Sequence, residues 1–214
     1  MFRVAVDALG SPVSDFDVKD GALDFASLFA GIETCAADGI AVALCGTAFA
    51  FVHLLDELER RRTLYRLPQG SRVMECGGFK GRSRELPRVE LYARLEDALG
   101  VPMEMMVNQY GMTELGSQFY DSLLREPSET RRKLGPPWAR VVIADPNSGE
   151  PAAAGAVGTV VVYDLANTGS VLAVQTADLG RTVEDGFEVL GREPGAEERG
   201  CSIAADAMLA DSVP

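Results

Sequence analysis

Residues 40–78 read IAVALCGTAFAFVHLLDELERRRTLYRLPQGSRVMECGG, and this stretch decides the fold class. It begins with the short apolar run IAVALCG, which is typical of a buried strand and closes on a glycine. Apolar residues then recur at helical spacing, which predicts an amphipathic helix from Ala48 to about Arg61. A second short apolar run, RVMECGG, follows. Strand, helix and strand in this order are the unit from which a parallel sheet is built.

The same alternation extends on both sides of this stretch. Residues 21–39 (GALDFASLFAGIETCAADG) show helical periodicity, and residues 87–100 (PRVELYARLEDALG) predict a helix that Pro87 opens and Gly100 ends. The apolar segment VPMEMMVNQYG that follows is typical of a further strand. Because parallel strands need helical crossovers and are buried on both faces, we expect a mostly parallel, doubly wound α/β sheet through about residue 115.

The character of the sequence changes after this sheet. Residues 138–166 (WARVVIADPNSGEPAAAGAVGTVVVYDLA) hold two Val-rich runs around the turn signal DPNSG and no helical pattern. Two more short strands, VLAVQTADLG and GFEVLGR, are expected on either side of a turn at residues 184–186. We therefore predict an α/β part at residues 1–115, a β-rich part of the same domain at residues 116–192, and a short C-terminal tail at residues 193–214.

Composition and charge exclude several classes of protein. The chain has 214 residues with 32 acidic and 20 basic side chains, which gives a formal net charge of −12. Such a surface repels phosphate, so no nucleic-acid partner is expected. The longest weakly polar stretch falls short of the roughly 20 apolar residues that span a bilayer, so no membrane span is expected. The four cysteines form no CxxC pair, which argues against a zinc site or disulfide scaffold and favours a reducing, cytoplasmic location.

The single histidine, His53, restricts the available chemistry. Metal motifs with two histidines cannot be built, and a Ser-His-Asp triad would have to use this residue. His53 lies on the apolar stripe of the helix expected after Ala48, where a packing role is the more frequent one. Hydrolase chemistry of the triad type is therefore not favoured.

In an open parallel sheet, ligands bind at the carboxyl ends of the strands, where loops and helix N-termini converge. Three loops qualify, namely Gly46-Thr47, residues 76–81 (CGGFKG) and residues 108–114 (NQYGMTE). None matches the GxxxxGK(S/T) or GxGxxG pattern, so the phosphate-loop and dinucleotide fingerprints are absent. A glycine pair alone indicates a tight turn more often than a ligand cradle.

The segment NQYGMTELG at residues 108–116 resembles the Tyr-Gly-x-Thr-Glu motif of the acyl-adenylate-forming (AMP-binding) superfamily, which includes acyl-CoA synthetases, phenylacetate-CoA ligases and firefly luciferase. More of the chain resembles one branch, the acyl-protein synthetase (LuxE) family, whose members activate fatty acids in bacterial bioluminescence. The resembling stretches run in the family's order from about residue 40 to the chain end. They are LCGTAFAFVHLLDEL, MECGGFKGRSREL, NQYGMTELGSQFYD, GPPWARVVIADPNSGEP, GTVVVYDLAN, VQTADLGRTVEDGFEVLGR and ERGCSIAADAML.

This resemblance implies a fold, an activity and partners. The fold is the C-terminal half of an adenylate-forming domain. The activity is ATP-dependent activation of a long-chain fatty acid as acyl-AMP, followed by transfer of the acyl group to a protein cysteine, with ATP and Mg²⁺ as cofactors. Nothing in residues 1–40 resembles the family's upstream loop that grips the β- and γ-phosphates, so an N-terminal truncation is expected. An acyl-receiving reductase and the missing N-terminal half are the partners that the resemblance implies.

Residue roles in the central motif follow from the match. Thr113 would hydrogen-bond the α-phosphate, Glu114 would hold magnesium, and Tyr110 would pack its ring on the adenine. Gly111 belongs to the same nucleotide-binding turn. These are the groups that adenylation needs, because the reaction requires positioning, charge neutralisation and a donor to the phosphoryl oxygens.

Other matching motifs supply the rest of the nucleotide site. Gly77 and Gly78 would let the backbone approach the adenine closely. Asp178 in QTAD matches the acidic residue that binds ribose hydroxyls, and Arg192 in LGR matches the arginine at the hinge into a mobile C-terminal part. Taken singly, each of these residues has a plainer interpretation as a turn or surface residue, so their joint order carries the assignment.

Two further residues are candidates for the chemical steps. Cys201 stands where the family carries an acyl-acceptor cysteine; Arg199 favours its thiolate, whereas Glu197 and Glu198 oppose it. An acceptor role and an inert, half-buried cysteine both stay open. The superfamily uses a lysine near the C-terminus for adenylation, and this chain has no lysine after Lys133. Lys80 is the one lysine inside a candidate loop, where it could approach the carboxylate or the phosphate. A solvated turn lysine is the alternative.

Two other functions stay open at this point. The chain could be a non-catalytic fragment that binds a nucleotide or an acyl-adenylate, which would not exchange pyrophosphate into ATP. It could also be a phenylacetate-type ligase that uses coenzyme A, whose product would be a soluble thioester rather than an acylated protein.

Overall fold

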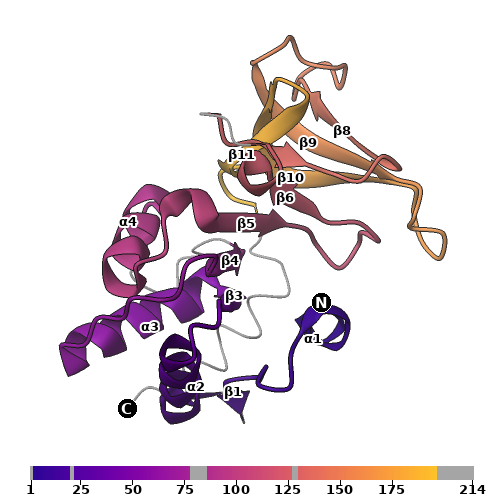
Figure 1. The fold of residues 1–214 in the computed structure, drawn as a ribbon. Coiled ribbons are helices and arrows are strands. Elements are labelled where there is room, and N and C mark those ends of the chain that lie inside the picture. Colours follow the sequence, from indigo (N-terminus) through magenta and orange to yellow (C-terminus); the bar gives the residue numbers. More distant parts are fainter. Residues whose placement is uncertain (1, 20–21, 78–85, 127–129, 197–214) are drawn as a thin grey trace. The chain divides into compact units, whose positions relative to one another are not determined.

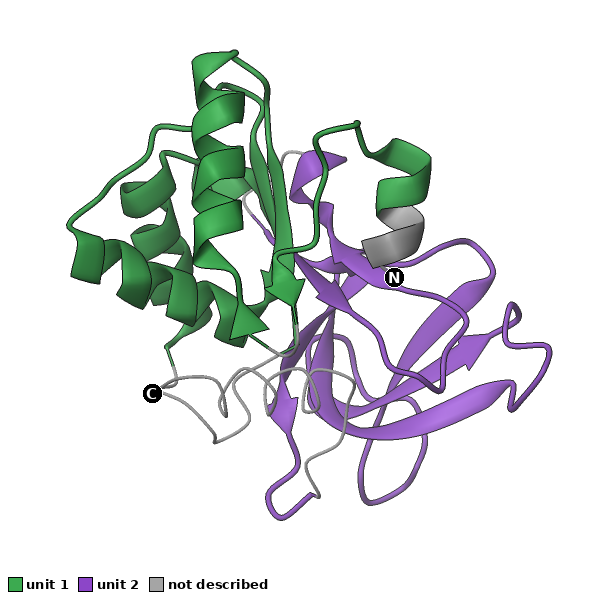
Figure 2. Cartoon of the chain, turned by 90° about the horizontal axis from the view of Figure 1, so that it is seen from below, with its two compact units in different colours: residues 1–106, 202–214 green, residues 107–201 purple. Residues whose placement is uncertain are grey.

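A computed structural model describes residues 2–19, 22–77, 86–126 and 130–196. The described residues form two compact units, and Figure 2 draws each in its own colour. Unit 1 runs up to Met106 and unit 2 begins at Val107, so the boundary between them falls inside a strand. None of the helices within these ranges is long and apolar enough to span a bilayer.

Unit 1 combines helices with two pairs of strands (Figure 1). The pair β1–β2 is antiparallel and the pair β3–β4 is parallel, as the strand, helix, strand pattern predicts. In chain order the elements are α1 (Phe2–Leu9), β1 (Val18–Lys19), β2 (Ala22–Leu23), α2 (Phe25–Ala37), β3 (Ala43–Thr47), α3 (Ala48–Arg61), β4 (Arg72–Cys76), α4 (Arg88–Leu99) and the 3-10 turn η1 (Met103–Met105).

Local capping explains where the helices of unit 1 begin and end. Asp24 opens α2 by accepting a hydrogen bond from the Ser27 amide at 3.0 Å. Thr47 opens α3 in the same way, because its hydroxyl accepts from the Ala50 amide at 3.1 Å. The helix α4 ends at Gly100, whose φ of 71° is the left-handed conformation that a glycine adopts without strain. The predicted bounds of α3 and α4 are therefore confirmed.

The core of unit 1 forms where α3 packs against β3, β4 and α4. Leu58 of α3, Val73 of β4 and Leu95 of α4 are fully buried there. His53 is half-buried on α3, and its ring meets the Phe49 ring edge-on with the centroids 4.3 Å apart. The packing role expected for this histidine is therefore the one that the structure shows.

Unit 2 is built from antiparallel strands in the spatial order β5-β6-β7-β11-β10-β9-β8. The two Val-rich runs form neighbouring strands, and the last two strands flank the predicted turn, so the antiparallel part is confirmed. The elements are β5 (Met106–Tyr110), β6 (Phe119–Asp121), η2 (Ser122–Leu124), β7 (Lys133–Leu134), β8 (Ala139–Ala144), β9 (Val157–Asp164), β10 (Ala173–Val183) and β11 (Gly186–Arg192).

A small aromatic and aliphatic core holds this sheet together. Phe119 of β6 and Phe187 of β11 meet edge-to-face with their ring centroids 5.4 Å apart. Val160 and Val162 of β9 and Ile143 of β8 complete the buried cluster. The chain as a whole is an α/β protein with strands of both senses, which agrees with the predicted class.

Candidate functional site

The central motif, NQYGMTE, lies where β5 ends and the loop of residues 111–118 begins. The Tyr110 hydroxyl donates a hydrogen bond to Asp178 Oδ2 at 2.8 Å, although 68 positions separate the two residues. Arg192 Nε lies 3.5 Å from Asp178 Oδ1. Unit 2 therefore brings together three residues that the sequence assigned to one nucleotide site.

A β-bulge explains why Asp178 is aimed at Tyr110. The pairing of β10 with β9 shifts between Gln175 and Leu179, which places Asp178 inside the irregular segment. The Thr176 hydroxyl holds this segment in place, because it donates to the Val160 carbonyl at 2.8 Å and accepts from the Asp178 amide at 3.0 Å. Bulges of this kind redirect side chains and are frequent beside functional sites. Across the sheet, Asp178 pairs with Arg192 of β11.

Burial fixes the protonation state of Tyr110. Its ring packs against Phe119 and Phe187, with centroid distances of 6.2 and 5.8 Å. This burial, and then the neighbouring Asp178 carboxylate, raise the pKa of the Tyr110 hydroxyl above its usual value. The hydroxyl therefore remains a hydrogen-bond donor at neutral pH. The Asp178 side chain is 17% exposed, so solvent or a ligand can still reach its carboxylate.

Thr113 and Glu114 are exposed on the loop after Tyr110. The Thr113 hydroxyl donates to Glu114 Oε2 at 3.1 Å, so the two side chains present their oxygens side by side. A hydroxyl and a carboxylate in this arrangement are hard oxygen ligands of the kind that Mg²⁺ takes together with phosphate oxygens. Within the described ranges, no group of three His, Cys, Asp or Glu side chains is placed to hold a metal ion. A magnesium that one carboxylate and a nucleotide hold needs no such group.

The remaining predicted residues lie elsewhere. Gly77 follows β4 in unit 1 with a φ of 80°, a conformation that suits glycine, and its predicted contact with adenine stays a prediction. Two positions before Gly77, the buried Glu75 of β4 accepts a hydrogen bond from the Tyr92 hydroxyl at 3.1 Å. Gly78, Lys80 and Cys201 lie outside the described residues.

A buried ion pair beneath the motif was not anticipated from the sequence. Lys133 of β7 donates from Nζ to Asp121 Oδ1 at 2.6 Å and to the Asn108 carbonyl at 2.8 Å. The Asn108 amide and Arg131 Nη1 each donate to Asp121 Oδ2 at 2.8 Å. Asn108 is the first residue of the motif, so this network fixes the strand that carries Tyr110.

The hydrogen bonds and positive charges of this network lower the pKa of the Asp121 carboxyl. Burial alone would raise the pKa of its carboxyl, but the charge and hydrogen bond of Lys133, with the Asn108 amide and Arg131, outweigh it and hold the pKa below its usual value. Two-residue strands such as β7 have no periodicity, and a lysine in such a sequence is normally interpreted as solvated. No signal in the sequence alone marked this pair.

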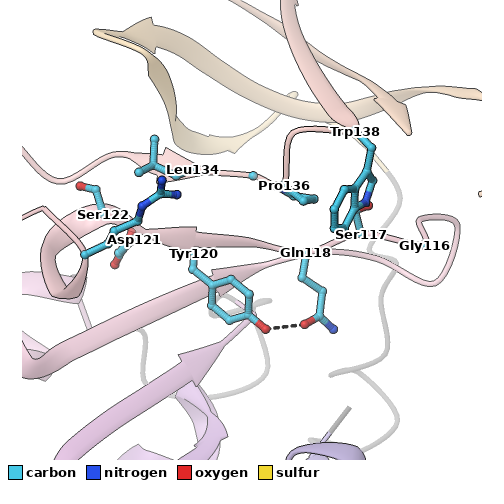
Figure 3. Close-up of a pocket in the computed structure, with 11 residues that line it drawn as sticks. Gly116, Ser117, Gln118, Tyr120, Asp121, Ser122, Leu134, Pro136 and Trp138 are labelled. Atoms are coloured by element: carbon cyan, nitrogen blue, oxygen red, sulfur yellow. Dashed lines mark hydrogen bonds between the residues drawn. The ribbon is translucent and has the colours of Figure 1, made fainter. Parts of the chain in front are cut away.

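Unit 2 also contains a hollow of about 440 Å³ (Figure 3). It is lined by residues 116–118, 120–122, 125, 134–136 and 138. At one end Trp138 donates from its indole nitrogen to the Ser117 hydroxyl at 3.1 Å, and nearby the Tyr120 hydroxyl donates to Gln118. Of the predicted site residues that the structure describes, none lines this hollow.

Three solved structures share this fold. They are a long-chain-fatty-acid-CoA ligase (FadD1) from Archaeoglobus fulgidus (TM-score 0.51, 14% identity, 77% of this chain and 36% of that chain), the A-PCP part of McyG complexed with phenylalanyl-adenylate (TM-score 0.52, 16% identity, 79% and 33%), and ATP-bound MatB from Rhodopseudomonas palustris (TM-score 0.51, 19% identity, 71% and 31%). At these identities the likeness shows the fold alone. The predicted fold, the C-terminal part of an adenylate-forming ligase, is thereby confirmed.

The chain spans only about a third of the length of these solved structures, since it covers 36%, 33% and 31% of them. No curated protein matches the sequence. The profile of one family, described as acyl-protein synthetase, LuxE, matches residues 6–210. Because that match takes in nearly the whole sequence, including the motifs around Tyr110 and Asp178, the chain belongs to the acyl-protein synthetase family LuxE.

Proposed function

We propose that this chain carries the AMP site of an ATP-dependent acyl-protein ligase, which activates a long-chain fatty acid as acyl-AMP and passes the acyl group to a protein cysteine. Membership of the family and the ligase fold support a ligase of the adenylate-forming type. The observation that carries the finer proposal is the hydrogen bond of 2.8 Å between Tyr110 and Asp178, which joins two nucleotide-site motifs within one unit.

In this proposal the Asp178 carboxylate holds the ribose. A carboxylate offers about four lone-pair directions, and here Tyr110 takes one of them while Arg192 lies near another. The remaining directions accept the two ribose hydroxyls. The Tyr110 ring bounds the adenosine on one side. Its hydroxyl is a donor at neutral pH, and its hydrogen bond orients the Asp178 carboxylate.

Thr113 and Glu114 act at the phosphate in this scheme. A carboxylate oxygen of the fatty acid attacks the α-phosphorus, a C–O–P mixed anhydride forms, and the bond from the α-phosphorus to pyrophosphate breaks. The Thr113 hydroxyl turns its one proton from Glu114 Oε2 to an α-phosphate oxygen whose charge increases during this step. Glu114 is the residue that would hold Mg²⁺, which when bound neutralises phosphate charge.

The acyl acceptor is the second part of the proposal. The Cys201 thiolate attacks the acyl carbon, a thioester forms, and AMP leaves. Transfer to coenzyme A is the competing outcome, because one similar solved structure is a fatty-acid-CoA ligase. The two outcomes differ in whether the thioester remains on protein.

Binding of an acyl-AMP analogue to the chain tests the nucleotide site. We expect calorimetry to show that the wild type binds the analogue. The affinity should fall at least about tenfold, or by about 1.4 kcal/mol, in Asp178→Asn, because this change removes the charged acceptor of the ribose hydroxyls. Glu150→Gln, an exposed carboxylate in the β8–β9 turn, is the matched control and should bind as the wild type does. Equal affinity of Asp178→Asn and wild type would contradict the assignment.

Catalysis is tested separately by exchange of labelled pyrophosphate into ATP. The proposal predicts exchange that depends on a long-chain fatty acid. Binding of the analogue with no exchange would instead identify a non-catalytic nucleotide-binding module.

For the acceptor, the chain is supplied with acyl-adenylate and its intact mass is measured before and after hydroxylamine. We expect a hydroxylamine-labile acyl adduct that disappears in Cys201→Ser and remains in Cys35→Ser, a half-buried cysteine of α2. An adduct that survives in Cys201→Ser, or a product found only as a coenzyme A thioester, would show that the acceptor is another group.

A further inference from the structure

The connection between β9 and β10 lies directly against the loop that bears Thr113 and Glu114. Asn167, in this connection, donates from Nδ2 to the Glu114 carbonyl at 2.7 Å and to the Val171 carbonyl at 2.9 Å. The side-chain amide has two N–H donors, so both are used. One side chain thereby ties the backbone of the motif loop to its own connection, although the loop and the connection are 53 positions apart.

Close packing of the two backbones beside Asn167 also joins the loop to the connection between β9 and β10. A Cβ atom on Gly116 would lie 3.2 Å from the Ala166 carbonyl carbon and oxygen and 3.3 Å from the Asn167 nitrogen. These distances are shorter than ordinary van der Waals contact, so the glycine lets two backbones approach. The loop is therefore seated against the connection as well as hydrogen-bonded to it.

A second tie fixes the far end of the loop. The Ser117 hydroxyl donates to Asp164 Oδ1 at 2.8 Å, and Asp164 is buried at the end of β9. The same carboxylate oxygen accepts from the Ala166 amide at 3.0 Å, which shapes the start of the connection. The Ser117 hydroxyl also accepts a hydrogen bond from the Trp138 indole nitrogen at 3.1 Å. The loop is thus held at residue 114 and at residue 117, with Thr113 and Glu114 projecting into solvent.

We infer that Asn167 is a positioning residue for the phosphate end of the nucleotide site, because it fixes the backbone of Glu114 and with it the Thr113 hydroxyl and the Glu114 carboxylate. The inference rests on the proposed function, since it needs the loop to meet a phosphate. Groups that bind a charged phosphate gain most when their geometry is set before the ligand arrives. Asn167 does not need to touch the ligand for this role.

The inference predicts a selective loss of affinity. A variant of Asn167 should weaken binding of AMP, whose phosphate meets the loop. It should leave binding of adenosine unchanged, because adenosine contacts Tyr110 and Asp178 and has no phosphate. A general loss of structure would weaken both ligands, so the ratio of the two dissociation constants separates positioning from stability.

The test uses Asn167→Asp, which keeps the shape but places acceptor oxygens where two carbonyls need donors, and Asn167→Ala as a second variant should the first not fold. Asn147→Asp, in the β8–β9 turn, is the matched control. Calorimetry with Mg²⁺ gives the dissociation constants of AMP and adenosine for each protein. The emission of Trp138, the single tryptophan of the chain, reports whether the tie at Ser117 persists.

We expect the dissociation constant of AMP to rise about tenfold in the Asn167 variants, as for the loss of one or two hydrogen bonds, with adenosine binding within about twofold of wild type. Wild-type affinity for AMP in both variants would overturn the inference and leave the proposed function intact. An equal loss for AMP and adenosine would also overturn it, since the role would then be structural. A wild-type chain that binds neither ligand would overturn the proposed function and the inference together.

Discussion

Two charged residues, Asp121 and Lys133, face each other in the interior of unit 2 with 2.6 Å between Oδ1 and Nζ. Each side chain is almost fully buried, so each charge needs a partner to offset its loss of hydration, and Arg131 is a second partner of Asp121. The sequence motifs singled out Tyr110 and Asp178, which the structure places in contact, because those residues stand in recognisable order. The motifs did not identify Asp121 and Lys133, because a buried charge can be recognised only once its partner is known.

Removing one member of this pair should be costly. Lys133→Met leaves the Asp121 carboxylate buried without its main counter-charge, and we expect the free energy of unfolding to fall by about 3–5 kcal/mol. Lys19→Met is the control, because the Lys19–Asp24 pair is exposed and should contribute little to the free energy of unfolding. Urea denaturation followed by circular dichroism measures both. A loss of under about 1 kcal/mol in Lys133→Met would show that the pair does not hold β5.

The raised pKa of Tyr110 gives stability a dependence on alkaline pH. The folded pKa lies above the unfolded one, so the contribution of this hydroxyl is fully present below about pH 10 and is lost as the pH rises further, since only the unfolded chain releases the proton there. Tyr110→Phe removes the hydroxyl. We expect this variant to be less stable than wild type by about 1 kcal/mol at neutral pH, with the difference shrinking by about pH 11.

Denaturation of both proteins at about pH 8 and about pH 11 checks this expectation. Tyr163→Phe, at an exposed position on β9, serves as the control and should differ little from wild type at either pH. A difference between wild type and Tyr110→Phe that stays the same at both pH values would mean that the hydroxyl titrates normally in the folded protein.

At the scale of elements, the sequence predicted long periodic segments and missed short ones. The helices α3 and α4 and the strands β8 to β11 follow from apolar periodicity and turn residues. Strands β6 and β7 have three and two residues, too few to show an alternation. The bulges in β10 were also missed, because a bulge depends on the pairing of strands rather than on the residues of one strand. Yet one of them aims Asp178 at Tyr110.

Gly180 permits the close packing that follows this bulge. A Cβ atom there would lie 2.6 Å from the Glu188 carbonyl and 2.9 Å from a Val160 methyl group, neither of which can move far. We expect Gly180→Ala to lower the free energy of unfolding by about 1–3 kcal/mol, as for an overpacked core. Gly169→Ala, where a Cβ meets open space, should be neutral or slightly stabilising. Thermal and urea unfolding of both variants test this, and equal stabilities would contradict the packing argument.

At the scale of the whole molecule, the fold class and the family were predictable because several motifs occur in one order. The family match reaches from residue 6 to residue 210, whereas the motifs recognised in the sequence begin near residue 40. The helix α1 and the short hairpin of β1 and β2 contain none of those motifs, so they were not predicted from the sequence. The chain also corresponds to only about a third of the length of each similar ligase.

We propose that the loop after Tyr110 and the bulge at Asp178 together bind adenosine monophosphate. A crystal structure of the chain with a non-hydrolysable acyl-AMP analogue tests it most directly. We expect both ribose hydroxyls to lie within hydrogen-bond distance of the Asp178 carboxylate and a phosphate oxygen to lie within reach of the Thr113 hydroxyl. An analogue bound elsewhere, for instance in the hollow beside Trp138, would contradict it.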